Sequence, residues 1–393
     1  MTSGKLHKPA SVYTTYNKVK LIRGGKDYFE LLKQMIKDAR HTVHLQTYIF
    51  GEDETGNEIA SALINAAKSG VKVYAVADGY ASRTLSEKFI TSLKNSGINF
   101  RWFNSIFKSR YFYFGRRLHH KVIVVDAFVS LVGGINITDK YNDLDEPAWL
   151  DWALYVRGEI SSNLNKICID IWNKSGWGKR PKKIINVSAT SELPSKKCFV
   201  RARVNDWVRG KNQVSKSYIE MMKKAQHSII IMSSYFLPGV TIKKNLIAAA
   251  RRGVNIKLVV AGVSDIQLAK QAEKYMYRWV LKNNIELYEY NKTVLHGKLG
   301  VCDGKWVTVG SYNINNISAY ASIELNLDIL NKQFAEEAET ALLRIIQNDC
   351  VQVTEAAFDL GNGIFMLAWQ RICYLIYRVT LYLFTFYFKR QHG

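Results

Sequence analysis

The segment LHHKVIVVDAFVSLVGGIN, residues 118–136, returns in pattern as LHGKLGVCDGKWVTVGSYN, residues 295–313. Both copies carry histidine, lysine, aspartate, glycine and asparagine at the same spacing. Agreement of five residue types at fixed distances, twice in one chain, indicates a duplicated unit. The residues are His119, Lys121, Asp126, Gly133 and Asn136 in the first copy, and His296, Lys298, Asp303, Gly310 and Asn313 in the second.

Each copy predicts a strand, a turn and a returning strand. The apolar run 122–125 is typical of a buried strand, and Asp303-Gly304 is a strong hairpin signal. Residues two apart in a strand point to the same face, so each histidine should project beside the lysine that follows it. The returning strand should bring the asparagine of its copy close to both.

The repeat continues outside these motifs. AlaArgHisThrVal at 39–43 is echoed by AlaGlnHisSerIle at 225–229. Each half alternates helical and apolar strand patterns, which predicts an α/β sandwich dominated by parallel strands in each half. The helices are expected at 29–40, 57–69, 217–226 and 241–252, and the strands at 42–50, 71–77, 228–236 and 254–261.

A length of 393 residues is enough for two such units. Residues 174–197 are rich in lysine and arginine and are interrupted by glycine and proline, which is typical of a linker. We therefore divide the chain into a first half, a basic linker, a second half and a C-terminal segment, at 18–173, 174–197, 198–350 and 351–393.

The motif residues suit phosphodiester chemistry. Such a reaction needs a nucleophile, a proton for the leaving alcohol, and hydrogen-bond donors for the phosphate oxygens. Each copy supplies one histidine at the motif position, whereas two copies facing each other supply two such histidines, two lysines and two asparagines. We therefore expect one shared active site that uses no metal ion and no cofactor.

Other polar residues of the motif region have simpler interpretations. Asp126 and Asp303 close strands at turns, so we expect them to orient the motif and not to react. His120 alternates to the face opposite His119 and should be structural. His41, His44 and His227 lie at junctions between helix and strand, and we leave them out of the site.

Composition indicates a polyanionic partner. The 55 lysines and arginines against 33 acidic residues give a net charge of +22, which favours binding to anionic lipid or nucleic acid. The five cysteines are scattered and lack Cys-x-x-Cys spacing, so they indicate neither a disulfide framework nor a zinc site. The N-terminal 25 residues show no apolar segment typical of a signal peptide or a membrane anchor.

The paired motifs resemble those of the phospholipase D superfamily. Gly133-Gly134-x-Asn136 and Gly310-Ser311-x-Asn313 look like the bacterial cardiolipin synthases, in a short form without N-terminal transmembrane helices. The resemblance covers about residues 18–350 and implies two pseudo-symmetric α/β/α sandwich halves with one active site at their interface. It implies catalytic roles for His119, Lys121, Asp126, His296, Lys298 and Asp303, and supporting or phosphate-binding roles for Asn136, Asn313, Ser311, Asp151 and Glu324.

The resemblance also implies a mechanism in two steps. His119 attacks phosphorus to form a phosphatidyl-histidine, and His296 protonates the departing alcohol, although the pseudo-symmetry leaves the reverse assignment open. An acidic residue downstream of each motif is implied to hold a histidine tautomer, and Asp151 and Glu324 match those positions.

Two further segments favour a membrane partner over nucleic acid. Residues 100–118 interleave aromatic and basic side chains directly before His119, which suits a membrane interface, a mobile loop or a base-stacking surface. Residues 364–388 are apolar with one polar stripe, which predicts an amphipathic helix lying in the interface. A membrane span and a helix packed on the protein's own core remain the alternatives for this segment. The stripe is Arg371, Tyr374, Arg378, Tyr382, Thr385 and Lys389.

Together these features predict a phosphatidyltransferase of the cardiolipin synthase type that uses phosphatidylglycerol. A hydrolytic phospholipase D is the alternative, followed by a nuclease or a catalytically silent membrane scaffold. We expect a peripheral protein on the cytoplasmic side of the bacterial membrane, bound to anionic phospholipid. We expect a monomer, because both half-sites are in one chain.

Overall fold

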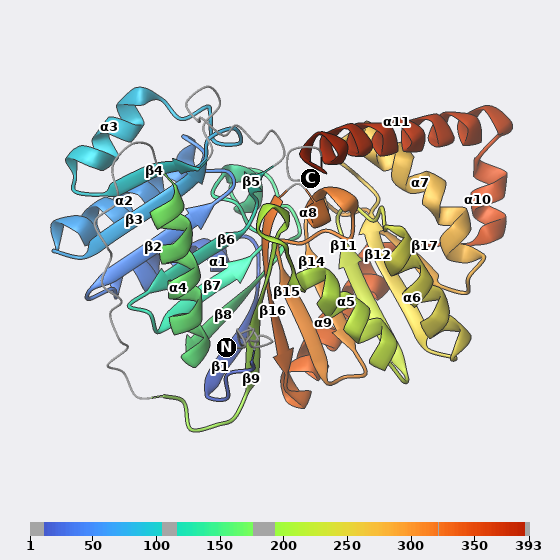
Figure 1. Cartoon of the computed structure of the whole chain (residues 1–393), viewed down its shortest axis with the longest axis horizontal. Coiled ribbons are helices and arrows are strands. Elements are labelled where there is room, and N and C mark those ends of the chain that lie inside the picture. The colour runs from blue at the N-terminus through green and yellow to red at the C-terminus, as the bar shows by residue number, and fades with distance from the viewer. Residues whose placement is uncertain (1–11, 104–115, 176–192, 321, 390–393) are drawn as a thin grey trace, which may run out of the picture.

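The computed structural model describes residues 12–103, 116–175, 193–320 and 322–389, and for 381–389 it describes the backbone alone. Two sheets with their helices lie side by side and meet along a central seam (Figure 1). The first half contains β1 (Asn17–Arg23), α1 (Lys26–Lys37), β2 (Thr42–Thr47), α2 (Glu54–Lys68), β3 (Lys72–Asp78), α3 (Glu87–Asn95), β4 (Asn99–Phe103), β5 (Arg117–Leu118), β6 (Lys121–Val125), β7 (Val129–Gly133), β8 (Trp152–Gly158) and α4 (Glu159–Lys174), with a 3-10 turn at Asp139–Tyr141.

The second half repeats this order of elements. It contains β9 (Phe199–Asp206), β10 (Lys211–Asn212), α5 (Gln213–Lys224), β11 (Ser228–Ser233), α6 (Val240–Arg251), β12 (Asn255–Ala261), α7 (Gln267–Leu281), β13 (Glu286–Tyr290), β14 (Lys298–Cys302), β15 (Trp306–Gly310), α8 (Asn316–Tyr320), β16 (Ser322–Leu330), α9 (Lys332–Asp349) and β17 (Cys350–Val353), with a 3-10 turn at Trp207–Arg209. The C-terminal segment forms α10 (Glu355–Gly361) and α11 (Ile364–Lys389).

The two sheets have the same topology, which confirms the duplicated fold. The first runs β1-β8-β7-β6-β2-β3-β4, and the second runs β9-β16-β15-β14-β11-β12-β13, extended by β10 at one edge and β17 at the other. The expectation of mainly parallel sheets is wrong. Only β2, β3 and β4, and their counterparts β11, β12 and β13, pair in parallel within these paths. The motif hairpin and the strand after it add antiparallel pairs in each half.

The motif glycines are explained by the close approach of neighbouring strands. A Cβ atom at Gly133 would lie 2.4 Å from the Trp152 carbonyl oxygen, and one at Gly310 would lie 2.2 Å from that of Leu325. Any side chain would push β7 away from β8, or β15 away from β16. Glycine at these two positions therefore keeps the motif hairpin tight against the strand that returns from the site.

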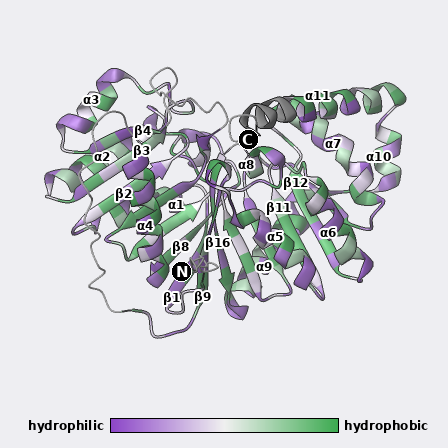
Figure 2. Cartoon of the chain, in the orientation of Figure 1, coloured by the Kyte–Doolittle hydropathy of each residue, from purple (hydrophilic) through white to green (hydrophobic). Residues whose placement is uncertain are grey.

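The halves share one hydrophobic core. Buried side chains of β6 and β7, such as Val124 and Val132, belong to the same cluster as Leu299 and Val309 of β14 and β15. In Figure 2 these central strands are largely hydrophobic, whereas the helices show both colours. Burial of this shared surface fixes the relative position of the two sheets, and therefore of the two motifs.

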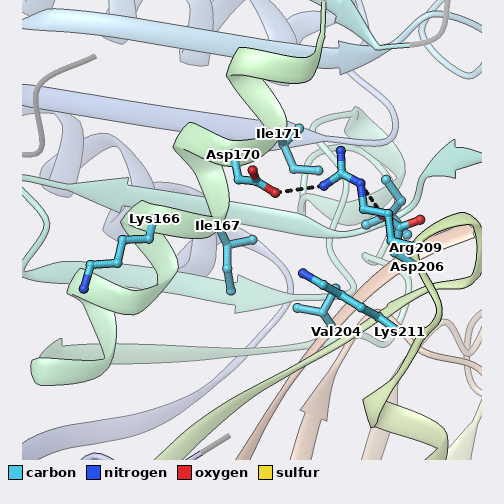
Figure 3. A pocket seen from close by; sticks show the side chains of 9 residues that line it. Lys166, Ile167, Asp170, Ile171, Val204, Asp206, Arg209 and Lys211 are labelled. Carbon is cyan, nitrogen blue, oxygen red and sulfur yellow. Dashed lines mark hydrogen bonds and ion pairs between the residues drawn. The ribbon is translucent and has the colours of Figure 1, made fainter. Parts of the chain in front are cut away.

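A polar bridge also crosses the seam. Arg209 of the second half donates to Asp170 of α4 at 2.8 Å and lies 3.5 Å from Asp206, beside a pocket that Lys166 and Lys211 help to line (Figure 3). Arg116 makes a bidentate contact with the Asp206 carboxylate, at 3.0 and 2.7 Å. Arg116, Arg209, Asp170 and Asp206 at the seam therefore form ion pairs with one another.

Most of the predicted linker, and most of the basic aromatic segment 100–118, lie outside the described residues. The division of the chain at the linker therefore stays a prediction. The described ends of segment 100–118 do not form an exposed lip, because Phe100 and Phe103 are buried and Arg101 stacks on Trp172 at 4.1 Å.

Helix α11 lies across the top of the second half, beside α7 (Figure 1). Gln370, Cys373 and Tyr377 are buried on the side that packs against α7, while much of the apolar surface of α11 faces outward. Among the predicted polar stripe, Arg371 and Arg378 are exposed and Tyr374 stacks on Tyr275. Within the described residues, no helix combines the length and apolar character that a membrane crossing requires.

Candidate active site

The backbone of each motif histidine pairs with the opposite half, at the start of β16 for His119 and at an isolated bridge just before β8 for His296. The backbone N–H of His119 donates to the Ile323 carbonyl at 3.0 Å, because β5 pairs in parallel with the start of β16. In the same way, His296 N–H donates to the Leu150 carbonyl at 2.7 Å. The residue after each acceptor is an acid, so backbone pairing across the seam places a carboxylate next to each imidazole.

The resulting carboxylate–histidine pairs are crossed between the halves. His119 Nδ1 lies 3.0 Å from Oε2 of Glu324, and His296 Nδ1 lies 2.6 Å from Oδ2 of Asp151. Both carboxylates are fully buried. A carboxylate at Nδ1 keeps the proton on that nitrogen and leaves Nε2 with its lone pair. Neither half could hold its own histidine in this way.

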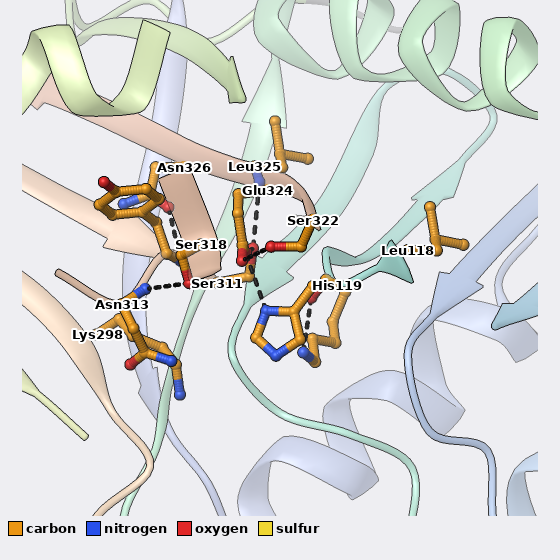
Figure 4. A network of polar contacts seen from close by, with 12 residues as sticks. Leu118, His119, Lys298, Ser311, Asn313, Ser318, Ser322, Glu324, Leu325 and Asn326 are labelled. Carbon is orange, nitrogen blue, oxygen red and sulfur yellow. Dashed lines mark hydrogen bonds and ion pairs between the residues drawn. The ribbon is translucent and has the colours of Figure 1, made fainter. Parts of the chain in front are cut away.

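The surroundings of the two carboxylates differ. Ser311 Oγ donates to Oε2 of Glu324 at 2.5 Å, and Ser322 Oγ donates to Oε1 at 2.7 Å (Figure 4). Asp151 instead accepts the backbone N–H of Trp152 at 2.7 Å on Oδ1. Gly134 replaces the serine in the first half, since a Cβ there would lie 2.4 Å from Oδ1 of Asp151. The two halves are therefore alike in pairing each histidine with a carboxylate, and they differ in the groups that hydrogen-bond to that carboxylate.

The electrostatics of the carboxylates follow this difference. Burial raises the pKa of Asp151 to about 6, against the opposing effects of Lys298 and the Trp152 N–H. Burial acts on Glu324 too, but the charges of His119 and Lys121 and the Ser311 hydrogen bond outweigh burial and hold the pKa of that carboxyl below its ordinary value. Glu324 is therefore the more firmly ionised of the two acids.

The two lysines are buried directly behind the histidines. Lys121 Nζ donates to the backbone carbonyl of His119 at 2.6 Å, and Lys298 Nζ donates to that of His296. Burial lowers the pKa of Lys121 to about 7 and that of Lys298 to about 8. Burying a cation without an anionic ligand raises the free energy of the protein, so the two lysines favour binding of a negatively charged group at this site.

Burial also lowers the pKa of both histidines. For His119 the nearby Glu324 opposes this effect, whereas the pKa of His296 falls well below its ordinary value through burial and the positive charge of Lys298. Burial therefore favours the neutral form of both imidazoles. A bound phosphodiester anion would favour the protonated form of either ring.

The motif asparagines lie at the site as predicted. Asn136 and Asn313 each line a cavity that also contains His119. Oδ1 of Asn313 accepts the Ser234 hydroxyl at 2.7 Å, which orients its amide group. Asn136 accepts the Ile49 N–H at 3.1 Å and donates to the Tyr141 hydroxyl at 2.9 Å.

The structure places Asp126 and Asp303 away from this site. Each follows the far end of a five-residue strand, roughly 16 Å from the lysine at the other end. The Asp126 carboxylate accepts the N–H groups of residues 40–42 at 2.7–2.8 Å. Asp303 accepts those of residues 226–228 at 2.8–3.0 Å. They anchor equivalent loops, which matches the orienting role that the turn positions predicted.

The remaining histidines contribute to packing. His120 is fully buried and contacts Gln46 Oε1 through Nε2 at 2.9 Å, and burial lowers its pKa to about 3. His44 stacks on Tyr74. The exposed His41 and His227 present backbone N–H groups to the motif aspartates.

Sequence reasoning missed the aromatic residues around the histidines. The Tyr48 ring contacts His119 edge-on at 4.9 Å and lies 5.1 Å from Lys121 Nζ. Tyr141 contacts His296 at 5.3 Å. Tyr48 is the first residue after β2 and Tyr235 is the second after β11, so the repeat aligns Tyr48 with Ser234 and gave no signal for the two tyrosines.

One cavity of about 640 Å³ is lined by both motif histidines, together with Asn136, Tyr48 and Tyr235. Its lining comes from both halves, which confirms that the two motifs form a single site. Among the described residues, no cluster of three or more histidine, cysteine or acidic side chains has an arrangement that could hold a metal ion.

Comparisons with known proteins agree with this geometry. The cardiolipin synthase, phospholipase D-like domain family matches residues 32–156 and 218–346. Cardiolipin synthase B of Escherichia coli (strain K12) is 31% identical over 349 residues, which cover 86% of this chain and 83% of that protein. Cardiolipin synthase 1 of Bacillus anthracis is 29% identical over 359 residues, 89% of this chain and 69% of that protein.

A solved structure shares the fold at low sequence identity. The phosphatidylserine synthase of Haemophilus influenzae Rd KW20 superimposes with a TM-score of 0.74 and 12% identity, covering 95% of this chain and 97% of that one. The two matched segments of the family profile each contain one motif and together span both halves of the site.

Proposed function

The chain belongs to the cardiolipin synthase family with phospholipase D-like domains, and from this premise we propose that it joins two phosphatidylglycerol molecules into cardiolipin and free glycerol. Phosphatidyl transfer is the activity that its relatives support. The observation that carries the proposal is the pair of crossed carboxylate–histidine contacts at one cavity between the halves. Each Nε2 is thereby available for chemistry.

In the first step, Nε2 of His119 attacks phosphorus of the donor lipid. A P–N bond forms, the P–O bond to the glycerol headgroup breaks, and His296 delivers a proton to the leaving oxygen. The ionised Glu324 supports the assignment of His119 as the nucleophile, because it stabilises the positive charge that this imidazole gains when the P–N bond forms. The raised pKa of Asp151 helps the Asp151–His296 pair to retain the proton that it must donate.

In the second step, a hydroxyl of another phosphatidylglycerol replaces the departed glycerol. His296 takes the hydroxyl proton, the oxygen attacks phosphorus, and the P–N bond breaks with its electrons returning to Nε2 of His119. Lys121, Lys298 and the two asparagines supply donors to the phosphate oxygens throughout. We propose no metal ion and no cofactor for either step.

We also propose peripheral binding to an anionic bilayer on the cytoplasmic side, by a monomer. The net charge of +22 favours an anionic surface. Helices α10 and α11 present apolar side chains outward, with Leu360 90% and Phe365 92% exposed. An outward apolar face next to basic residues is typical of helices that lie in the membrane interface.

The central test is incubation of the purified protein with phosphatidylglycerol vesicles, followed by mass spectrometry of the lipids. We expect cardiolipin and free glycerol, with and without EDTA. His119→Ala and His296→Ala should each abolish turnover, while the matched exposed variant His41→Ala should retain it. Phosphatidic acid as the main product would replace transfer by hydrolysis, and activity that needs an added divalent ion would contradict the metal-free mechanism.

The order of the histidines is tested with a phosphatidyl ester of p-nitrophenol. This leaving group departs without a proton, so His296→Ala should still release a burst of p-nitrophenolate, and His119→Ala should release none. The opposite pattern would exchange the two roles.

A further inference from the structure

Two cavities of different character meet at His119. The smaller, about 190 Å³, has His119, Ser322 and Glu324 at its inner end. The larger, about 640 Å³, extends from His119 past His296. Tyr48, Tyr235 and Ile266 line both cavities, so these spaces adjoin around the imidazole of His119.

The outer end of the smaller cavity is apolar and is built by helices of the second half and by α11. The apolar lining side chains are Leu237, Ile266, Ala269, Ile317 and Tyr377, and the polar Arg117, Asn313, Asn315 and Ser318 line the same cavity. Tyr377 enters this wall because α11 packs on α7: Tyr377 and Leu237 belong to one buried cluster with Met276. The C-terminal helix is therefore part of the wall of the cavity that contains His119.

The mouth of this cavity opens on an exposed apolar surface. Ile266 and Ile317 line the cavity and are nevertheless 51% and 45% exposed. On α11, Ile376 next to Tyr377 is 44% exposed, and Trp369 two turns earlier is 50% exposed. These exposed apolar side chains adjoin the apolar part of the cavity lining, in which Arg117 is the basic residue.

The larger cavity carries charge. Glu52, Asp53 and Asp265 line it, with Lys140 as the basic side chain. Carboxylates accept hydrogen bonds from hydroxyl groups and repel further anions. This lining therefore suits the hydroxyl groups of a glycerol headgroup next to the reacting centre.

We propose that the smaller cavity is the acyl-side subsite of the donor lipid, with Tyr377 of α11 as part of its wall, and that the larger cavity receives the leaving and accepting alcohols. This assignment rests on the proposed function. A volume of about 190 Å³ is below that of typical small-molecule pockets, so the subsite takes the glycerol backbone and the first methylenes, and the remaining chain stays in the bilayer. Burial of those methylenes stabilises the bound donor.

The test compares a long-chain lipid with a chainless diester. Ala269→Trp fills the outer end of the subsite, and Leu268→Trp adds the same side chain at an exposed neighbouring position outside the cavity. With dioleoyl phosphatidylglycerol vesicles, Ala269→Trp should lower kcat/KM at least tenfold, and Leu268→Trp should change it less than twofold. With bis(p-nitrophenyl) phosphate, which has no acyl chain, Leu268→Trp should again match the wild type, and the loss caused by Ala269→Trp should be at least threefold smaller than its loss with the lipid.

Ile317→Asp provides an independent variant should Ala269→Trp fail to fold, as judged by thermal unfolding. A carboxylate at the mouth should produce the same selective loss with the long-chain lipid. Equal losses with both substrates, or no loss with either, would overturn the subsite assignment while leaving the proposed function intact. A wild-type protein that makes no cardiolipin would instead refute the proposed function itself.

Discussion

Replacing Asp151 by asparagine should reduce activity much more than replacing Glu324 by glutamine, although the two acids occupy equivalent positions. In Glu324→Gln, the new amide oxygen can remain at the Oε2 position, where it accepts from His119 and Ser311. The new NH₂ group then faces Ser322, whose hydroxyl can rotate to accept it. The histidine tautomer is preserved and only the charge is lost.

The asparagine of Asp151→Asn has no such arrangement. Oδ1 of Asp151 accepts the Trp152 backbone N–H, which cannot rotate away, and Oδ2 faces His296 Nδ1. An NH₂ group directed at Trp152 would oppose one donor to another in a buried place, at a cost of about 1–3 kcal/mol. Directed at His296, the NH₂ group would force the proton from Nδ1 to Nε2 and produce the wrong tautomer.

The magnitudes follow from these contacts. Exchange of a charged for a neutral hydrogen-bond acceptor costs about 1–2 kcal/mol, so Glu324→Gln should lower kcat roughly 5- to 30-fold. A forced tautomer of a carboxylate-paired histidine costs on the order of 10⁴-fold in kcat. The two variants should therefore differ by on the order of a hundredfold or more.

The assay is steady-state cardiolipin formation from phosphatidylglycerol vesicles, with product measured by mass spectrometry and folding checked by thermal unfolding. Losses equal within threefold, or a larger loss in Glu324→Gln, would refute the argument from donors and acceptors. Correctly folded Asp151→Asn with nearly wild-type kcat would refute it as well.

Three further predictions concern stability and membrane binding. Burial lowers the pKa of Lys121 from 10.5 to about 7, so its charge destabilises the fold fully below pH 7, and this cost disappears as pH rises to 10.5. Lys121→Met should therefore abolish turnover yet raise the free energy of unfolding by on the order of 2–4 kcal/mol at pH 6, measured by urea denaturation; a destabilised variant would contradict this. Asp126→Ala removes the acceptor of three backbone N–H groups and should lower stability by about 2–4 kcal/mol while the folded fraction keeps its kcat, which distinguishes a loop anchor from a catalytic group. Phe365→Ser with Trp369→Ser should weaken sedimentation with anionic vesicles at least fivefold, whereas the exposed control Leu144→Ser should not; equal binding would contradict the role of α11.

The predicted helices and strands of each half appear in the structure, with shifted ends. The helix expected at 29–40 runs from Lys26 to Lys37, because Gly25, with a φ of 108°, is its N-cap. The parallel sheet was predicted wrongly because the alternation of helix and strand describes only three strands of each sheet. The two strands of the motif hairpin and the strand after them lie outside that alternation, and they pair antiparallel.

The sequence by itself determined the duplication, the residue types of the site and the chemistry they can perform, because these depend on local spacing and on functional groups. It identified His119, His296, Asp151 and Glu324, but not which acid holds which histidine. Only the shared core decided that, by setting the Ile323 and Leu150 carbonyls against the opposite motifs. The His296–Asp151 contact joins residues that are 145 positions apart in the sequence, and the His119–Glu324 contact joins residues 205 positions apart. Such contacts depend on how two complete sheets pack, which no local sequence pattern encodes.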